Sequence, residues 1–275
     1  MRALPRLARS VTGLAAAFVI GGCGPGQPTA AHPATPTSAK PAPTQPAPAT
    51  RSVALGHPST TPSPVAARPV PVDCRKARCV ALTFDAGPGP DTARLLDILK
   101  AKHVRVTFFL LGKNTRARPA LVRREAIEGH ELANHTWTHR RLTLVPQTEI
   151  RRELVTLQEQ IKQLTGRAPT LMRPPQGLTD ARIAEVCRSL GLAQILWSVT
   201  ANDYRDHEPA VITSRVLQGA RHNGIILLHD VYPGTVPAVP SIIDGLRQRG
   251  LTPVTVSQLF APNRPVPGRA YWNAL

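Results

Sequence analysis

Five short groups of polar residues in this chain could carry out hydrolytic chemistry, and each group ends an apolar, strand-like run. They occupy residues 83–88, 135–139, 173–177, 202–204 and 227–230. Between them they supply carboxylates, imidazoles and a guanidinium, which can activate water, hold a cation and protonate a leaving group. Because residues that end successive parallel strands meet at one mouth, the order of these groups along the chain predicts one catalytic site.

Three of these residues suggest a role from their type and spacing. Asp85 stands directly after its strand and suits a general base, although a turn aspartate before Gly87 is the simpler alternative for this residue alone. His135 and His139 are four residues apart. On a helical turn both imidazoles would face one way and could hold a divalent ion, whereas an isolated pair of this spacing is more often a surface coincidence. The four other groups favour the catalytic interpretation.

The elements that position these groups alternate along the chain. Strands are predicted at 80–85, 104–111, 131–134, 170–172, 192–199, 224–228 and 251–256. Helices are predicted at 91–103, 119–128, 147–164, 179–190, 209–218 and 237–249. Such alternation indicates an α/β domain with parallel strands, and the number of strands suits closure into a barrel.

Two of the motifs together are highly specific. They are Thr-Phe-Asp-x-Gly-Pro at 83–88 and His-Thr-x-x-His at 135–139, accompanied by Arg-Pro-Pro-x-Gly at 173–177. The sequence resembles the polysaccharide deacetylases with a NodB-homology domain, carbohydrate esterase family 4, over roughly residues 80–260. The resemblance implies a distorted (β/α) barrel that removes N- or O-acetyl groups from sugar polymers.

The resemblance also implies a role for each matching residue. Asp85 would be the base and Arg173 its partner, while Asp203 would orient His229 as the acid. His135 and His139 would hold a divalent metal, with Zn²⁺ the first choice and Co²⁺ or another divalent ion the alternative.

Three further residues are candidates for contacts with the substrate. The backbone N–H of Gln176 would help to bind the oxyanion. Trp197 and Leu227 could line an acetyl or sugar pocket, although core packing is the simpler explanation of both.

The chain departs from the family pattern most seriously at Ala86, where the family carries a second, metal-binding aspartate. A methyl group cannot be a ligand, so two protein ligands are left unless water, a neighbouring carboxylate or the substrate completes the site. Two hypotheses therefore compete: a hydrolase with a weaker or different metal site, and a wall-binding relative that has lost metal and activity. We favour the hydrolase, because base, acid, their partners and both histidines are all present.

The first 71 residues predict a location outside the cytoplasm. Residues 1–23 combine three arginines, a short apolar run and Gly-Gly-Cys, as in a bacterial lipoprotein signal that leaves Cys23 for lipidation; an ordinary secretory signal is the alternative. Residues 24–71 are rich in Pro, Ala, Thr and Ser and predict a disordered tether. A folded domain is expected at 72–262 and a C-terminal tail at 263–275.

Charge and cysteines limit the partners. The formal net charge is +17, which favours polyanions such as cell-wall polymers, while the export signal argues against nucleic acid. We expect a monomer that is anchored to the membrane and acts on cell-wall polysaccharide, first on N-acetylated peptidoglycan sugars and otherwise on chitin oligomers or acetylated xylan. A disulfide could join Cys74 and Cys79 in an oxidising compartment, and Cys187 lies on an apolar helical face.

Overall fold

The computed structural model describes residues 72–274. The predicted signal, the lipidation site Cys23 and the tether all lie outside the described residues, so they stay predictions. Within residues 72–274, no helix is long and apolar enough to cross a membrane.

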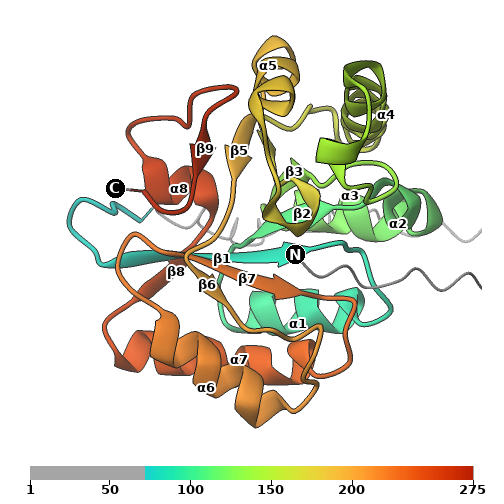
Figure 1. Ribbon diagram of the computed structural model, residues 1–275. Coiled ribbons are helices and arrows are strands. Elements are labelled where there is room, and N and C mark those ends of the chain that lie inside the picture. The colour runs from blue at the N-terminus through green and yellow to red at the C-terminus, as the bar shows by residue number, and fades with distance from the viewer. Residues whose placement is uncertain (1–71, 275) are drawn as a thin grey trace, which may run out of the picture. The chain divides into compact units, whose positions relative to one another are not determined.

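One sheet of parallel strands organises the described part of the chain (Figure 1). Its strands are β1 (Cys79–Asp85), β2 (Thr107–Leu110), β3 (Glu131–Asn134), β4 (Leu171–Met172), β5 (Ala193–Ile195), β6 (Val199–Thr200), β7 (Ile225–His229), β8 (Thr252–Val254) and β9 (Ala270–Tyr271). The order across the sheet is β6, β7, β1, β2, β3, β4, β5 and β9, and β8 also pairs with β1. The longest strands are apolar along their length because helices cover the outer face and packed side chains fill the inner one.

The sheet curls because its two ends are joined by a very short link. β5 and β6 lie near opposite ends of the strand order, yet only residues 196–198 separate them. The N–H of Leu196 donates to the carbonyl of Tyr271 at 2.7 Å, whereas the N–H of Ser198 donates to that of Ile225 at 3.0 Å. The single strand predicted at 192–199 is therefore two strands, because its partners change at this link. The predicted distorted barrel is confirmed as a curled, parallel half-barrel.

The segment predicted as a C-terminal tail is part of the same sheet. β9 pairs in parallel with β5, and Asn273 forms an antiparallel bridge with Gly224. The N–H of Ala274 also donates to the carbonyl of Asn223 at 3.0 Å. The expected boundary at residue 262 is wrong, because these backbone bonds fill the gap between β5 and β7.

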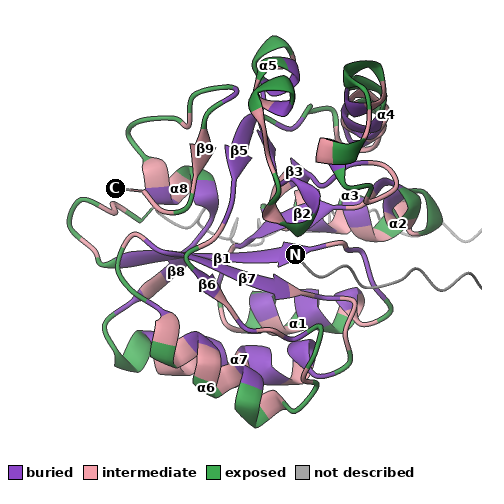
Figure 2. Ribbon diagram, viewed as in Figure 1, coloured by how far each residue is buried: buried purple, intermediate pink, exposed green. Residues whose placement is uncertain are grey.

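Helices cover the outside of the curled sheet (Figures 1 and 2). They are α1 (Thr92–Ala101), α2 (Gly112–Ala117), α3 (Pro119–Ile127), α4 (Gln147–Thr165), α5 (Ala181–Ser189), α6 (Pro209–Gly219), α7 (Thr235–Gln248) and α8 (Val256–Phe260), with 3₁₀ turns at Leu142–Leu144 and Pro175–Gly177. In α4, Ile150, Leu154, Leu157 and Ile161 recur at helical spacing and are buried. The helix ends at Gly166, whose φ of 77° is left-handed and suits glycine.

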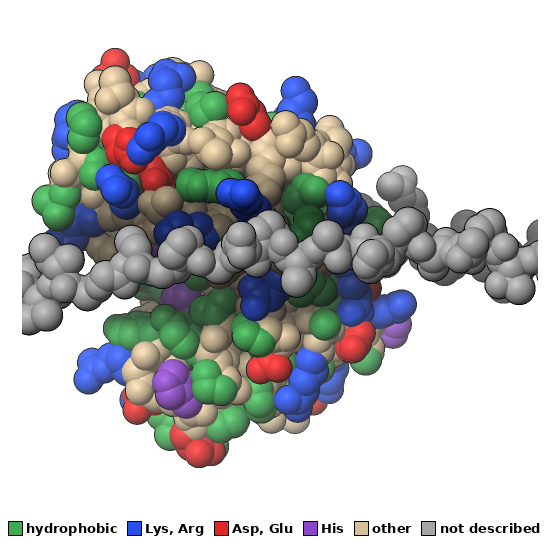
Figure 3. Space-filling model, turned by 90° about the vertical axis from the view of Figure 1, so that its right-hand side faces the viewer, with side chains coloured by type: hydrophobic (Ala, Val, Ile, Leu, Met, Phe, Trp, Pro, Cys, Tyr) green, Lys and Arg blue, Asp and Glu red, His purple; other side chains and the backbone are tan. Residues whose placement is uncertain are grey.

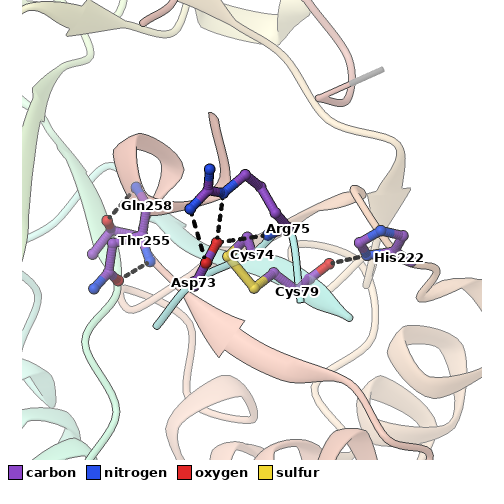
Figure 4. The surroundings of a disulfide bond; sticks show 7 residues. All are labelled: Asp73, Cys74, Arg75, Cys79, His222, Thr255 and Gln258. Carbon is purple, nitrogen blue, oxygen red and sulfur yellow. Dashed lines mark hydrogen bonds and ion pairs between the residues drawn. A yellow bond between two sulfur atoms is a disulfide. The ribbon is translucent and has the colours of Figure 1, made fainter. Parts of the chain in front are cut away.

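A disulfide closes the short loop that leads into β1 (Figure 4). Cys74 and Cys79 are bonded with their Cα atoms 5.5 Å apart, and Asp73 pairs with Arg75 inside the loop. Cys187 is a free thiol buried on α5, where burial raises its pKa to about 12, so it is unreactive at neutral pH.

Candidate active site

The candidate residues meet at the edge of the sheet where the strands end. β1 and β7 pair so that Asp85 is the register partner of His229. β3 pairs with β4 at Asn134 and Met172, which places the following residues, His135 and Arg173, side by side. The face toward which β1 and β7 point carries Lys and Arg side chains both above and below its middle (Figure 3).

Arg173 holds Asp85 in place. Its Nη1 lies 2.6 Å from Asp85 Oδ1, and the two side chains are 0% and 3% exposed. The remaining guanidinium donors bind the carbonyls of Ile195 and Leu196 at 2.8 and 3.0 Å, and Nη1 also lies 2.9 Å from Thr83 Oγ1. Burial lowers the pKa of Arg173, and the charge of Asp85 opposes this change. Because Oδ1 is held, Oδ2 is the oxygen of Asp85 that can accept a proton.

His135 and His139 converge, although not on the predicted helical turn. They lie in a loop after β3 in which Thr136 and His139 have φ of 69° and 63°. The N–H of Thr136 donates to Asn134 Oδ1 at 2.9 Å, and that of His139 donates to Thr136 Oγ1 at 3.1 Å. These two side-chain turns bend the loop until the imidazole centroids are 4.9 Å apart. The helical expectation was wrong because local side-chain acceptors replaced helical backbone bonding.

Both imidazoles are suited to be neutral ligands. The Nδ1–H of His135 donates to the carbonyl of Arg173 at 2.8 Å, which leaves the Nε2 lone pair free at 3.7 Å from Asp85 Oδ2. Burial lowers the pKa of His135 to about 4 and also lowers the pKa of His139. Near neutral pH each ring therefore offers an unprotonated nitrogen.

The third protein ligand of a typical catalytic metal site is missing. Ala86 has no donor atom, and residues 72–274 contain no group of three His, Cys, Asp or Glu side chains placed to hold a metal ion. The chain thus fits a divalent ion with two imidazoles, against the three protein ligands that catalytic zinc sites usually take.

The backbone at Ala86 still has the geometry that favours an aspartate. Its φ is 66°, in the left-handed region where Asp and Asn are much better tolerated than alanine. Its N–H donates to the carbonyl of Phe109 at 3.0 Å, and its carbonyl accepts from Asn114 Nδ2 at 2.7 Å. The loop is therefore held in shape, and only the ligand side chain is absent.

His229 has its own buried orienting carboxylate. Its Nδ1–H donates to Asp203 Oδ1 at 2.8 Å, while its backbone N–H and the hydroxyl of Thr235 both donate to Asp203 Oδ2 at 2.7 Å. Burial lowers the pKa of His229, but the hydrogen bond and charge of Asp203 outweigh it and raise the pKa above its usual value. His229 Nε2–H is thus available as an acid.

The predicted substrate residues lie in the loop after Arg173, beside that loop, and on β7. Gln176 is exposed with φ of 59°, and its side chain accepts from Arg141 Nε at 3.0 Å. Trp197 packs against the same loop, since a Cβ on Gly177 would lie 2.7 Å from its indole. Leu227 is buried two residues before His229, on the same face of β7.

Sequence analysis missed three residues beside the acid. Thr235 fixes Asp203, and the rings of Tyr232 and Tyr204 lie 5.3 and 6.3 Å from the ring of His229. Tyr204 belongs to the polar group at 202–204 but was given no role from the sequence. Tyr232 follows His229 by three residues, which was the one available signal, and Thr235 had none.

Comparison with known proteins agrees with this geometry. The family model described as polysaccharide deacetylase matches residues 73–195. The peptidoglycan-N-acetylglucosamine deacetylase PgdA of Listeria monocytogenes is 35% identical over 195 residues, which are 70% of this chain and 41% of that protein. The chain thus spans about two fifths of that relative's length. A peptidoglycan-N-acetylglucosamine deacetylase of Bacillus cereus is 38% identical over 187 residues, which are 64% of this chain and 68% of that protein.

Two solved structures extend the comparison. A T48 deacetylase with substrate is 39% identical, with a TM-score of 0.70 over 73% of this chain and 99% of that one. A mutant of BA3943, described as a CE4 family pseudoenzyme with restored enzymatic activity, is 26% identical, with a TM-score of 0.64 over 67% and 68% of the two chains. Motifs, curled parallel sheet and extended similarity agree, and this chain belongs to the polysaccharide deacetylase family.

Proposed function

We propose that this protein removes N-acetyl groups from cell-wall amino sugars, with peptidoglycan as its substrate. The observation that carries the proposal is the pairing of Asp85 with His229 across β1 and β7. Each of the two has a separate buried partner, Arg173 for the base and Asp203 for the acid. A base and an acid held independently on neighbouring strand ends are what hydrolysis of an amide requires.

The steps follow from the positions of these groups. Asp85 Oδ2 takes a proton from water as the water oxygen attacks the acetyl carbonyl carbon. The resulting oxyanion is stabilised by the backbone N–H of Gln176. His229 Nε2–H then gives its proton to the sugar nitrogen as the carbon–nitrogen bond breaks, which releases acetate and leaves a free amine.

His135 and His139 would hold a divalent cation at this site, Zn²⁺ by preference and Co²⁺ or another divalent ion otherwise. When bound, such an ion polarises the acetyl carbonyl as a Lewis acid. With two imidazoles in place of three protein ligands, the chain should bind the ion more weakly than a complete site does. The neutral state of both rings supports this assignment.

The N-terminal sequence and the net charge support the proposed location, and the named relatives support the proposed substrate. The N-terminal signal, its Cys23 and the basic net charge support a lipid-anchored protein outside the cytoplasm that faces the wall. The Listeria and Bacillus relatives are named for N-acetylglucosamine in peptidoglycan, which supports the same sugar here.

A second candidate is a wall-binding relative with impaired catalysis. Ala86 supports it, because the described residues lack a third metal ligand. A structural neighbour is described as a CE4 family pseudoenzyme, which supports the same candidate.

Acetate release from purified bacterial walls tests both candidates. The full chain is incubated with walls at added Zn²⁺ or Co²⁺ and after chelation, and the resulting muropeptides are analysed by mass spectrometry. We expect metal-stimulated loss of acetyl groups that disappears in His229→Ala, whereas Glu185→Gln, an exposed change on α5, should behave as wild type. Binding to walls with no acetate released at any metal concentration would establish the second candidate instead.

A further inference from the structure

The loop after the base packs directly onto Asp230, the residue after the acid. Residues 86–91, here called the base loop, connect β1 to α1. A Cβ on Gly87 would lie 2.4 Å from Asp230 Oδ1, and one on Gly89 would lie 2.5 Å from its carbonyl oxygen. Two glycines in the base loop are thus required by the presence of Asp230, because no larger residue leaves room for it.

Asp230 also binds the loop through hydrogen bonds. Its Oδ2 accepts from the hydroxyl of Thr92 and, at 3.4 Å, from the N–H of Gly89. The hydroxyl of Thr92 in turn accepts from the N–H of Gly89 at 2.7 Å. One carboxylate therefore ties the loop that begins at Asp85 to the end of the strand that carries His229.

A second buried carboxyl group lies in the same region. Glu125 on α3 is fully buried, and neither of its carboxyl oxygens has a hydrogen-bond partner among the described residues. Asp230 is 1% exposed, and its Oδ1 is likewise without a partner. Burial disfavours the charged form of both groups, and an ionised Asp230 disfavours ionisation of Glu125 further.

The surroundings decide which of the two carboxyl groups carries a negative charge. Burial raises the pKa of Glu125 well above its usual value, and the charge of Asp230 raises it further. Burial also raises the pKa of Asp230, to about 6, while Thr92, Gly89 and the charge of His229 oppose the rise. His229 from β7 is thus the titratable group that acts on Asp230, and Asp230 in turn acts on Glu125 from α3. Asp230 is therefore the ionised one of the two carboxyl groups at neutral pH.

We propose that Asp230 is a positioning residue for the hydrolysis, whose ionised carboxylate fixes the base loop against the acid strand and thereby sets the distance between Asp85 and His229. The inference rests on the proposed deacetylation and deepens it. Protonation weakens an acceptor that serves two donors, so the base loop is held less firmly in acid. Glu125 is the neighbouring carboxyl group that stays neutral while Asp230 is ionised.

Two isosteric variants separate the roles of the two carboxyl groups. Asp230→Asn imitates a permanently protonated Asp230, and we expect kcat to fall about 10- to 100-fold with KM nearly unchanged, because the reacting groups are misplaced. Its pH profile should also lose the acid-side inflection near pH 6. Glu125→Gln imitates the neutral state that Glu125 already has and should keep both kcat and the pH profile.

A spectroscopic titration tests the same link without any acetate release. The imidazole of His229 is followed by NMR from pH 4 to 9, with His229→Ala for assignment. In wild type its shifts should respond to Asp230 near pH 6. In Asp230→Asn this step should vanish and the pKa of His229 should fall, since a negative neighbour is lost.

The outcomes distinguish this inference from the proposed function. If wild type releases no acetate, the deacetylase proposal fails and the NMR titration alone decides the role of Asp230. If folded Asp230→Asn keeps the wild-type titration, or Glu125→Gln changes it as much, the inference is overturned. Should Asp230→Asn not fold, Thr92→Val removes the donor to Asp230 and should reproduce its effect, while Thr92→Ser restores wild-type behaviour.

Discussion

The acid side and the cation side of the site are built to different degrees of completeness. On the acid side, Asp203 is fully buried and accepts three hydrogen bonds, two from His229 and one from Thr235. On the cation side, His135 and His139 converge at 4.9 Å, but Ala86 supplies no third ligand. The side chains of the acid side are thus fixed by hydrogen bonds, whereas the cation side lacks a third protein ligand.

The contrast shows that the cation side lacks one ligand side chain, at residue 86, while the backbone at this residue still has the conformation that suits an aspartate. Ala86 keeps a left-handed φ of 66° and both of its backbone hydrogen bonds. These bonds hold the loop although residue 86 supplies no ligand. A single substitution should therefore weaken the acid side, whereas a single substitution at residue 86 should complete the cation side.

Arg173→Met should have the largest effect, because Arg173 contacts both the base and the cation side. Its guanidinium pairs with Asp85 and its carbonyl accepts from His135. Removing one member of a buried ion pair leaves an unpaired buried charge, which costs about 3–5 kcal/mol of unfolding free energy. Urea denaturation measures the loss. Arg152→Met, which breaks the exposed pair with Glu149, is the matched control and should cost far less than Arg173→Met. Equal losses would contradict the bridging role.

Asp203→Asn tests the acid side next. The amide cannot stabilise a protonated His229 as a carboxylate does, so we expect kcat to fall by roughly 10²- to 10⁴-fold while wall binding is kept. Steady-state kinetics on acetylated chitooligosaccharides, with sedimentation of bound protein, separates the two effects. A fall of less than tenfold would mean that His229 is not the proton donor.

Ala86→Asp restores the missing side chain on the cation side. The left-handed backbone already suits aspartate, so the change should be tolerated and should tighten binding of Zn²⁺ about tenfold or more. Competition with a chromophoric chelator measures the affinity, and His135→Ala in the same background should abolish the gain. Unchanged affinity would place the ion elsewhere.

The pH dependence of kcat separates the acid side from the cation side. The pKa of His229 is raised in the folded protein, so its protonated form persists to higher pH, and both its acid function and its stabilising contribution are lost as pH rises through the folded pKa. The alkaline limb of kcat should therefore move to lower pH in Asp203→Asn. In contrast, His135→Ala should leave the position of that limb in place.

Thr235→Val should have the smallest effect. It removes one of the three hydrogen bonds to Asp203 and keeps the shape of the side chain. A single hydrogen bond to a charged group contributes about 1.5–3 kcal/mol at most, and the two bonds from His229 stay in place, so we expect about a fivefold loss in kcat. A loss as large as that of Asp203→Asn would show that Thr235 does more than orient the carboxylate.

The sequence by itself determined most elements and predicted the candidate reacting groups. Apolar runs and helical spacing predicted β1, β3, α4 and α6 nearly to the residue, because burial imposes those periods on the chain. The motifs at 83–88 and 135–139 named Asp85 and the two imidazoles, since such chemistry needs particular side chains.

The tertiary structure alone decided how distant segments meet. β9 has only two residues and joins the sheet through β5 and Asn273, so no local pattern could reveal it. His135 and His139 converge through side-chain turns instead of a helix. Asp230 and Glu125, 105 positions apart in the sequence, share one buried region. Their ionisation depends on burial and on neighbours from separate elements, and these exist only once the chain has folded.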